Sequence, residues 1–183
     1  LFEPKIVERI PLGKCVSIER EIFPTLLSEG VHLESFFHTG YWSDIGTLRT
    51  YWRTHQDLHL AGRWPTGFRV RGGLIRAPGS RVDKTVSVHG TALIGTKAWV
   101  GPSVTFEGSV TVGEGVRIEE GAHIADSVLL EGARIGPKTH VERSIIGADS
   151  VVKADCRVGP DQVLGDGSRL SAHSQLVPNL AEK

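Results

Sequence analysis

The sequence predicts a mainly β chain, in which a parallel β-helix of six-residue repeats follows a small α+β region. Two observations predict the β-helix. From Val82 onward each repeat opens with Val, Ile or Leu, and once with Phe106. Four positions later comes a small or β-branched residue, as at Val86, Ala92 and Thr139. This double constraint is typical of a three-sided prism, in which each unit gives one strand and one turn and roughly 18 residues complete a coil.

Two of the repeats have five residues instead of six, namely 124–128 and 141–145. Both carry serine followed by an aliphatic residue, and they lie about one coil apart, so we expect their tightened corners to stack on one edge of the prism. Glycine follows the opening aliphatic residue in several repeats, where we expect it to permit a tight turn. These glycines are Gly95, Gly101, Gly113, Gly136, Gly147, Gly159 and Gly165.

The region before the repeats is expected to mix short helices and strands. Pro4 suits the first turn of a helix that Pro11 ends. A second helix begins close to Pro24, carries an apolar stripe, and ends at Gly30 in a left-handed cap. That stripe is formed by Phe23, Leu26 and Leu27.

The next two segments are predicted from aromatic content and from capping. Residues 32–45 are rich in aromatic side chains, which favour a strand. Thr47 can cap a following helix. Residues 63–81 are rich in Gly, Pro and Arg, and we interpret them as a connector and an irregular first coil. The apolar face of the capped helix is expected to contain Leu48, Tyr51, Trp52, His55 and Leu58.

Composition excludes several classes of protein. The 183 residues carry no net charge, so no basic footprint for nucleic acid is present. No apolar run approaches the ~20 residues that span a membrane. The only cysteines, Cys15 and Cys156, favour a reduced, cytoplasmic setting over a disulfide framework. Because the chain lacks methionine and begins at Leu1, we expect an upstream segment to be missing.

A prism of this kind can carry acyl transfer, which needs a histidine base and often a loop that projects from the prism. The repeats run on from Val82 to about Leu176 without a long insertion. Solvated surface positions therefore remain the simpler interpretation of the histidines. The candidates for a base are His89, His123, His140 and His173.

Two strings point to a different chemistry. Residues 16–24 read VSIEREIFP, and residues 40–47 read GYWSDIGT. In this order they resemble the end of the catalytic domain of sugar-1-phosphate nucleotidyltransferases, such as the mannose-1-phosphate guanylyltransferases, and the opening Leu1-Phe2-Glu3-Pro4 looks like the same region. The resemblance implies that residues 1–62 end a catalytic domain. Residues 82–183 are then its appended β-helix, which the resemblance to hexapeptide-repeat proteins implies is left-handed.

The resemblance implies a metal role for Asp44. In that family the aspartate of the aromatic-x-Asp-x-Gly motif helps to hold Mg²⁺, which offsets the charge of the reacting phosphates. The alternative is that Asp44 only organises the turn into the following helix. Ser43 stands where an apolar residue is usual and Leu48 where proline is common, and neither change touches the carboxylate.

The main catalytic residues are expected upstream of Leu1, so we predict that this chain alone is inactive. The full protein is expected to convert a nucleoside triphosphate and a sugar 1-phosphate into pyrophosphate and an NDP-sugar, GDP-mannose or similar. The β-helix is expected to serve oligomerisation, as a homo-oligomer, or regulation. A hexapeptide-repeat acyltransferase and a non-catalytic regulatory subunit remain as alternatives.

Overall fold

The computed structural model describes residues 3–178. Residues 1, 2 and 179–183 lie outside the described part, and with them Leu1 and Phe2 of the expected N-terminal string. The chain divides into two compact units, Leu1–Trp42 and Ser43–Lys183, which are taken separately below.

The first unit packs short helices around a small apolar cluster. It contains α1 (Pro4–Val7), the π-helix η1 (Ile18–Ile22) and α2 (Phe23–Ser28). Ser17 caps η1, because its hydroxyl accepts from the backbone N–H of Arg20, and its own N–H donates to the Glu21 carboxylate. Gly30 follows α2 at φ 74°, which confirms the expected left-handed cap. The buried members of the cluster are Ile6, Ile22 and Leu26.

Two expectations for this region are corrected. Leu27 is 60% exposed, so only part of the predicted stripe is buried. The strand expected within residues 32–45 does not form, and Phe36 and Phe37 are 91% and 88% exposed. A strand needs a hydrogen-bonded neighbour, and the described residues supply none beside this segment.

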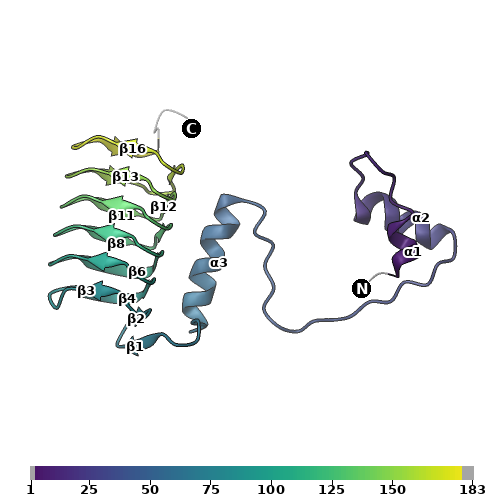
Figure 1. Cartoon of the computed structure of the whole chain (residues 1–183), viewed down its shortest axis with the longest axis horizontal. Helices are drawn as coiled ribbons and strands as arrows, with labels where there is room; N and C mark the ends of the chain where they lie inside the picture. The colour runs from purple at the N-terminus through teal and green to yellow at the C-terminus, as the bar shows by residue number, and fades with distance from the viewer. Residues whose placement is uncertain (1–2, 179–183) are drawn as a thin grey trace. The chain divides into compact units, whose positions relative to one another are not determined.

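The second unit is the expected prism, with helix α3 (Leu48–Leu60) lying beside it (Figure 1). The prism begins within the segment that was expected to be irregular. There β1 (Arg69–Arg71) pairs antiparallel with β2 (Leu74–Arg76), and β2 pairs in parallel with the next coil. All further pairings between described strands are parallel, and each coil advances the register by 17 or 18 residues, as from Arg117 to Arg134 and from Arg81 to Trp99.

The strands form three faces. Face 1 contains β2, the second halves of β4 (Ser87–Ile94) and β6 (Thr105–Val112), β9 (Val128–Leu129), β12 (Ile145–Ile146) and β15 (Val163–Leu164). Face 2 contains β3 (Arg81–Val82), β5 (Trp99–Val100), β7 (Arg117–Ile118), β10 (Arg134–Ile135), β13 (Val151–Val152) and β16 (Arg169–Leu170). Face 3 contains the first halves of β4 and β6, β8 (His123–Ala125), β11 (His140–Glu142), β14 (Arg157–Val158) and β17 (Gln175–Leu176).

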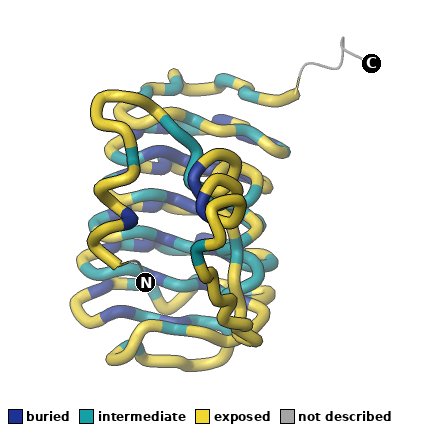
Figure 2. Tube along the Cα trace, turned by 90° about the vertical axis from the view of Figure 1, so that its right-hand side faces the viewer, coloured by how far each residue is buried: buried dark blue, intermediate teal, exposed yellow. Residues whose placement is uncertain are grey.

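The core lies along the prism axis and follows the repeat. Each repeat-opening residue from Ile94 to Val158 is at most 1% exposed, and buried positions recur from coil to coil (Figure 2). The residue four places on is also buried from Ala92 to Thr139. Because these buried positions stack from coil to coil, they form one continuous apolar column. Burial of each aliphatic side chain in it contributes roughly 1.5–3 kcal/mol to stability. The inward positions that the repeat predicts are confirmed.

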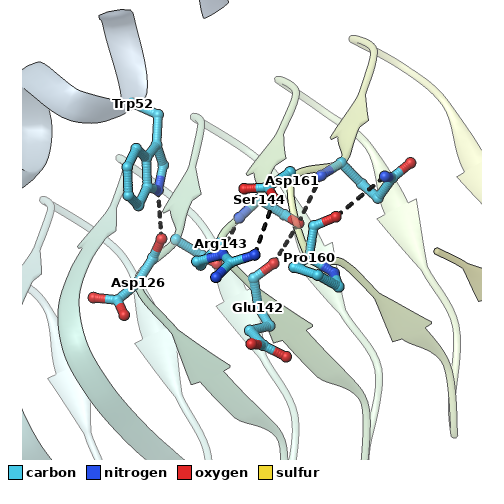
Figure 3. A network of polar contacts seen from close by, with 9 residues as sticks. Trp52, Asp126, Glu142, Arg143, Ser144, Pro160 and Asp161 are labelled. Carbon is cyan, nitrogen blue, oxygen red and sulfur yellow. Dashed lines mark hydrogen bonds and ion pairs between the residues drawn. The ribbon is translucent and has the colours of Figure 1, made fainter. Parts of the chain in front are cut away.

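The two short repeats do stack on one edge, between faces 3 and 1, which we call the short-unit edge. Ser127 Oγ donates to Ala125 O and accepts from the N–H of Ser144 in the next coil. Ser144 repeats the pattern, donating to Glu142 O and accepting from the N–H of Gln162, and Arg143 forms an ion pair with Asp161 beside it (Figure 3). At the corner where each short repeat lacks a sixth residue, the serine hydroxyl thus supplies a hydrogen bond to the next coil.

The glycines that follow the opening aliphatic residues have a different role from the expected one. Among them only Gly159 has a positive φ. At Gly136 an added Cβ would lie 2.6 Å from Ala154 N, and at Gly147 2.6 Å from Asp166 N. These positions therefore require glycine because the backbone of the next coil approaches them, and not because a turn needs an unusual backbone angle.

Gly147→Ala is expected to lower the free energy of unfolding by about 2 kcal/mol or more, because the new methyl group would force two coils apart. Gly165→Ala is the matched control, since Gly165 occupies the same repeat position and the nearest described atom to its Cβ would be Ser168 Oγ at 3.6 Å. Urea unfolding followed by circular dichroism measures both variants. Equal losses in the two variants would contradict crowding between coils as the reason for glycine.

Candidate functional site

Asp44 lies in the turn that leads into α3. Its Oδ1 accepts from the backbone N–H of Gly46 at 3.1 Å, and the side chain is exposed. Thr47 then caps the helix, since its hydroxyl accepts from the N–H of Thr50 while Thr50 Oγ1 accepts from the N–H of Thr47. In the described structure Asp44 therefore organises the turn, and its second carboxylate oxygen is not used by that hydrogen bond.

The two departures from the family motif fit this local structure. Ser43 Oγ lies 2.9 Å from Thr54 Oγ1, so the serine fastens the incoming chain to the second turn of α3. Leu48 is the first residue of α3, a position where proline is favoured because its N–H has no partner within the helix. Leucine can occupy the same position without loss of a hydrogen bond.

The described residues do not form a metal site by themselves. Across residues 3–178 no group of three or more His, Cys, Asp or Glu side chains is placed to hold an ion. Mg²⁺ takes six oxygen ligands and shares them with substrate phosphates, so the single Asp44 carboxylate is not enough. A metal role for Asp44 needs further ligands from outside the described residues.

Helix α3 is fastened to face 1 by polar side chains. Trp52 Nε1 donates to Asp126 O at 2.5 Å on the short-unit edge (Figure 3), and Gln56 Nε2 donates to Ser109 O at 3.1 Å. His59 lies between two threonines, with Nδ1 2.7 Å from Thr91 Oγ1 and Nε2 3.0 Å from Thr111 Oγ1. Along α3 the contacts thus run from a later coil to an earlier one.

The spacing of these contacts follows from two repeat distances. Seven helical residues, as from Trp52 to His59, rise by about 10 Å, and two strand spacings amount to about 9.6 Å. Side chains seven residues apart on α3 can therefore meet groups two coils apart on the prism.

The predicted apolar face of α3 is partly confirmed, because it includes four side chains that are partly buried. These are Tyr51, Trp52, His55 and Leu58. Leu48, which begins the stripe, is 58% exposed.

His59 is the most buried polar residue of this contact, at 5% exposed. Burial and, to a smaller extent, the neighbouring His55 together lower the pKa of His59 to about 4. Burial also lowers the pKa of His55, whose Nδ1 lies 3.1 Å from Thr111 Oγ1. At neutral pH both imidazoles are therefore neutral, which allows α3 to pack on the sheet without a buried charge.

A groove of about 760 Å³ lies where the N-terminal end of α3 meets the later coils of face 1. Its walls combine apolar groups with the charged pair Arg143 and Asp161. Trp52 forms both a wall of the groove and the hydrogen bond to the prism, so the two features depend on one side chain. The lining residues are Leu48, Arg49, Trp52, Arg143, Ile145, Asp161, Gln162 and Val163.

Of the four candidate histidines, two lie together. The rings of His123 and His140 meet edge to face on face 3, with centroids 5.5 Å apart, and His123 Nε2 lies 3.1 Å from Glu107 Oε2. His173 lies 3.9 Å from Asp155, in a turn. His89 is exposed on an earlier coil of face 3. Only His123 and His140 share a hollow, of about 410 Å³, on that face.

Sequence reasoning missed the partners of α3 on the prism. Thr91 and Thr111 occupy outward positions of their repeats, and nothing in the repeat pattern distinguishes them from solvent-facing threonines. Gln56 and His59 were likewise not singled out, although each lies four residues after a stripe member, Trp52 or His55, and so on the same helical face. Polar residues on that face could have signalled a helix that docks on backbone and hydroxyl groups.

Stability is expected to depend on pH through His59. Because its folded pKa of about 4 lies below the unfolded value of 6.5, the stabilisation is complete above pH 6.5 and declines as pH falls toward about 4. We expect the wild-type protein to lose about 1–3 kcal/mol of unfolding free energy over that range from this group. Urea titrations at several pH values measure the loss.

His59→Gln should reduce that pH dependence, because glutamine keeps hydrogen-bonding capacity without a titrating ring. His173→Gln is the matched control, since His173 is exposed, and it should leave the wild-type profile unchanged. An unaltered profile in His59→Gln would rule out the buried imidazole as the cause.

Known proteins match this arrangement in the same order along the chain. A family model described as "Nucleotidyl transferase" matches residues 1–60, and one described as "GMPPB C-terminal domain" matches residues 81–177. Glucose-1-phosphate adenylyltransferases of Bacillus mycoides (strain KBAB4) and Bacillus anthracis are 30% identical over 155 residues, which is 80% of this chain and 39% of theirs. The chain thus spans about two fifths of the length of these relatives.

Among solved structures, a hexapeptide transferase family protein from Anaplasma phagocytophilum is 24% identical, with a TM-score of 0.46, over 53% of this chain and 65% of that one. The assignment rests instead on the family models, one of which covers more than half of the chain. The chain belongs to the sugar-1-phosphate nucleotidyltransferase family, in the part where the end of a nucleotidyltransferase domain is followed by a left-handed β-helix.

Proposed function

We propose that this chain is the C-terminal part of an enzyme that makes an NDP-sugar and pyrophosphate from a nucleoside triphosphate and a sugar 1-phosphate. One observation carries the proposal. The Asp44 turn leads directly into a capped helix that docks on the β-helix, and the two family models match in the same order. The relatives named glucose-1-phosphate adenylyltransferase support this reaction class. GDP-mannose or a similar product follows from the sequence resemblance alone.

The reaction brings anions together. A phosphate oxygen of the sugar 1-phosphate forms a bond to the α-phosphorus of the triphosphate, and the bond from that phosphorus to the departing pyrophosphate breaks. We propose Mg²⁺ as the cofactor of the full protein, where it would offset this charge. Asp44 would contribute one carboxylate, and the other ligands would come from substrate and from residues outside this chain.

We also propose an oligomeric state and a cellular location for the full protein. The β-helix is proposed to form a homo-oligomer, because its faces are flat arrays of side chains that can pack on another copy. A reducing, cytoplasmic location is supported by the two free cysteines, Cys15 exposed and Cys156 buried. Across the described residues no helix is long and apolar enough to cross a membrane.

The alternatives lead to different binding partners. Acyl transfer would use the His123 and His140 hollow on face 3, and it requires the chain to bind acetyl-CoA. A non-catalytic subunit requires stable association with a full-length homologue. Calorimetric titration with acetyl-CoA and co-purification with a full-length nucleotidyltransferase separate these two from the proposed function.

The chain alone is expected to release no pyrophosphate from any pair of nucleoside triphosphate and sugar 1-phosphate in the presence of Mg²⁺. The reason is that the described residues form no complete metal site. A coupled pyrophosphate assay over several pairs measures this, with a full-length nucleotidyltransferase as the positive control. Turnover by the 183-residue chain would contradict the proposal.

Two substitutions at Asp44 separate its metal role from its turn role. Asp44→Asn keeps an oxygen that can accept from Gly46 but removes the charge, whereas Asp44→Ala removes both. In the full-length protein we expect both variants to lose at least about tenfold in kcat, because both lose the metal-binding carboxylate. Wild-type activity in Asp44→Asn, together with a loss in Asp44→Ala, would show that only the turn matters. Thermal unfolding of both variants monitors the fold.

A further inference from the structure

Face 2 carries a row of arginines along the prism. The row occupies one register position on successive coils, and its members are direct strand partners where they adjoin, as with Arg117 and Arg134. Trp99 and Val151 fill the remaining positions between the first and last arginine, and Arg117 Cζ lies 5.2 Å from the centre of the Trp99 ring. The arginines of the row are Arg81, Arg117, Arg134 and Arg169, all exposed.

Like charges on directly opposite strand residues destabilise a sheet. Yet none of these four arginines forms an ion pair with a carboxylate within residues 3–178. Helix α3 lies on face 1, so no described helix of the second unit covers face 2. The guanidinium groups of these arginines are therefore available to pair with carboxylates of another molecule.

The prism itself carries an acidic surface. On the four coils from Arg117 to Arg169, the turn from face 1 into face 2 carries an exposed carboxylate two or three residues before the row position. Within residues 3–178, Glu114 is the only one of these carboxylates that forms an ion pair, with Lys97, and Asp166 Oδ1 accepts from the N–H of Ala148. We call this row the acidic edge, and its members are Glu114, Glu131, Asp149 and Asp166.

We propose that face 2 is the contact between two copies of this chain, with the arginine row of each copy against the acidic edge of the other. The coil that carries Arg134 also carries Glu131 three residues earlier, so both charges lie at one height along the prism. A two-fold axis parallel to the prism keeps those heights and sets Arg117, Arg134 and Arg169 opposite carboxylates of the partner copy. A two-fold axis across the prism would set arginine opposite arginine.

The composition of the face supports a protein partner over a polyanion. Arginine and tryptophan are enriched where protein surfaces meet, and arginine forms bidentate pairs with carboxylates. A long polyanion lying on the arginine row would be repelled by the adjoining acidic edge. The inference rests on the proposed homo-oligomer and is independent of the proposed nucleotidyl transfer.

Charge reversal within one pair tests the contact. Arg134→Glu and Glu131→Arg should each raise the dissociation constant of the homodimer by at least about tenfold, because each places like charges together twice in the symmetric contact. The double variant R134E/E131R restores opposite charges and should recover wild-type association. Arg157→Glu, on face 3, is the matched control and should leave association unchanged. Sedimentation velocity over a concentration series measures all four variants and the wild-type chain.

The outcomes separate this contact from oligomerisation in general. A wild-type oligomer that Arg134→Glu leaves intact would overturn face 2 as the contact and leave the homo-oligomer standing. A wild-type chain that stays monomeric would overturn both. Single variants that weaken association without rescue in the double variant would also overturn the charge pairing. A monomeric chain that binds polyphosphate through Arg134 would assign the face to a polyanion instead.

Discussion

The close approach of successive coils is the constraint on which the rest of the structure depends. Each coil hydrogen-bonds to the next through its backbone, and at Gly136 and Gly147 the two backbones leave no room for a methyl group. This spacing fixes the strand register, and the register decides that every repeat-opening aliphatic residue points inward. Outward side chains are stacked by the same register, which produces the arginine row, the histidine pair and the threonines that receive α3.

The same spacing explains why a helix can lie along the prism. An α-helix rises by 5.4 Å in each turn and a coil adds about 4.8 Å, so side chains one or two turns apart meet groups one or two coils apart. Trp52 and His59 use this match on the short-unit edge and on face 1. The shortened repeats matter here too, because their serine ladder holds the edge to which Trp52 donates its hydrogen bond.

The prism could be predicted from the sequence in detail because its buried positions recur with the period of the repeat. Position in the repeat alone specifies which side chain is buried, from Ile94 to Val158. The shared serine of the short repeats likewise predicted the stacked corners. The role of the glycines was missed, because contact with the next coil is a feature of the stack and does not appear within one repeat.

The candidate site was less predictable. The motif identified Asp44, but the hydrogen bond of Asp44 to Gly46 is local. It does not show which other residues would bind a metal ion together with this carboxylate. The strand predicted near Phe36 and Phe37 does not form for a related reason. Aromatic content favours a strand only where a neighbouring strand can pair with it, and the local sequence does not show that neighbour. The docking of α3 depends on pairings such as His59 with Thr91, which no local pattern encodes.

Helix α3 runs from the later coils toward the earlier ones, opposite to the order of the coils along the chain. This direction determines how an insertion in α3 would move the turn that precedes it. One extra helical turn and one extra coil lengthen their elements by nearly the same distance. An insertion of about four residues in α3 would therefore carry the Asp44 turn about one coil further along the prism, with the polar contacts shifted to the next rung. The length of α3 thus sets the height along the prism at which the Asp44 turn lies.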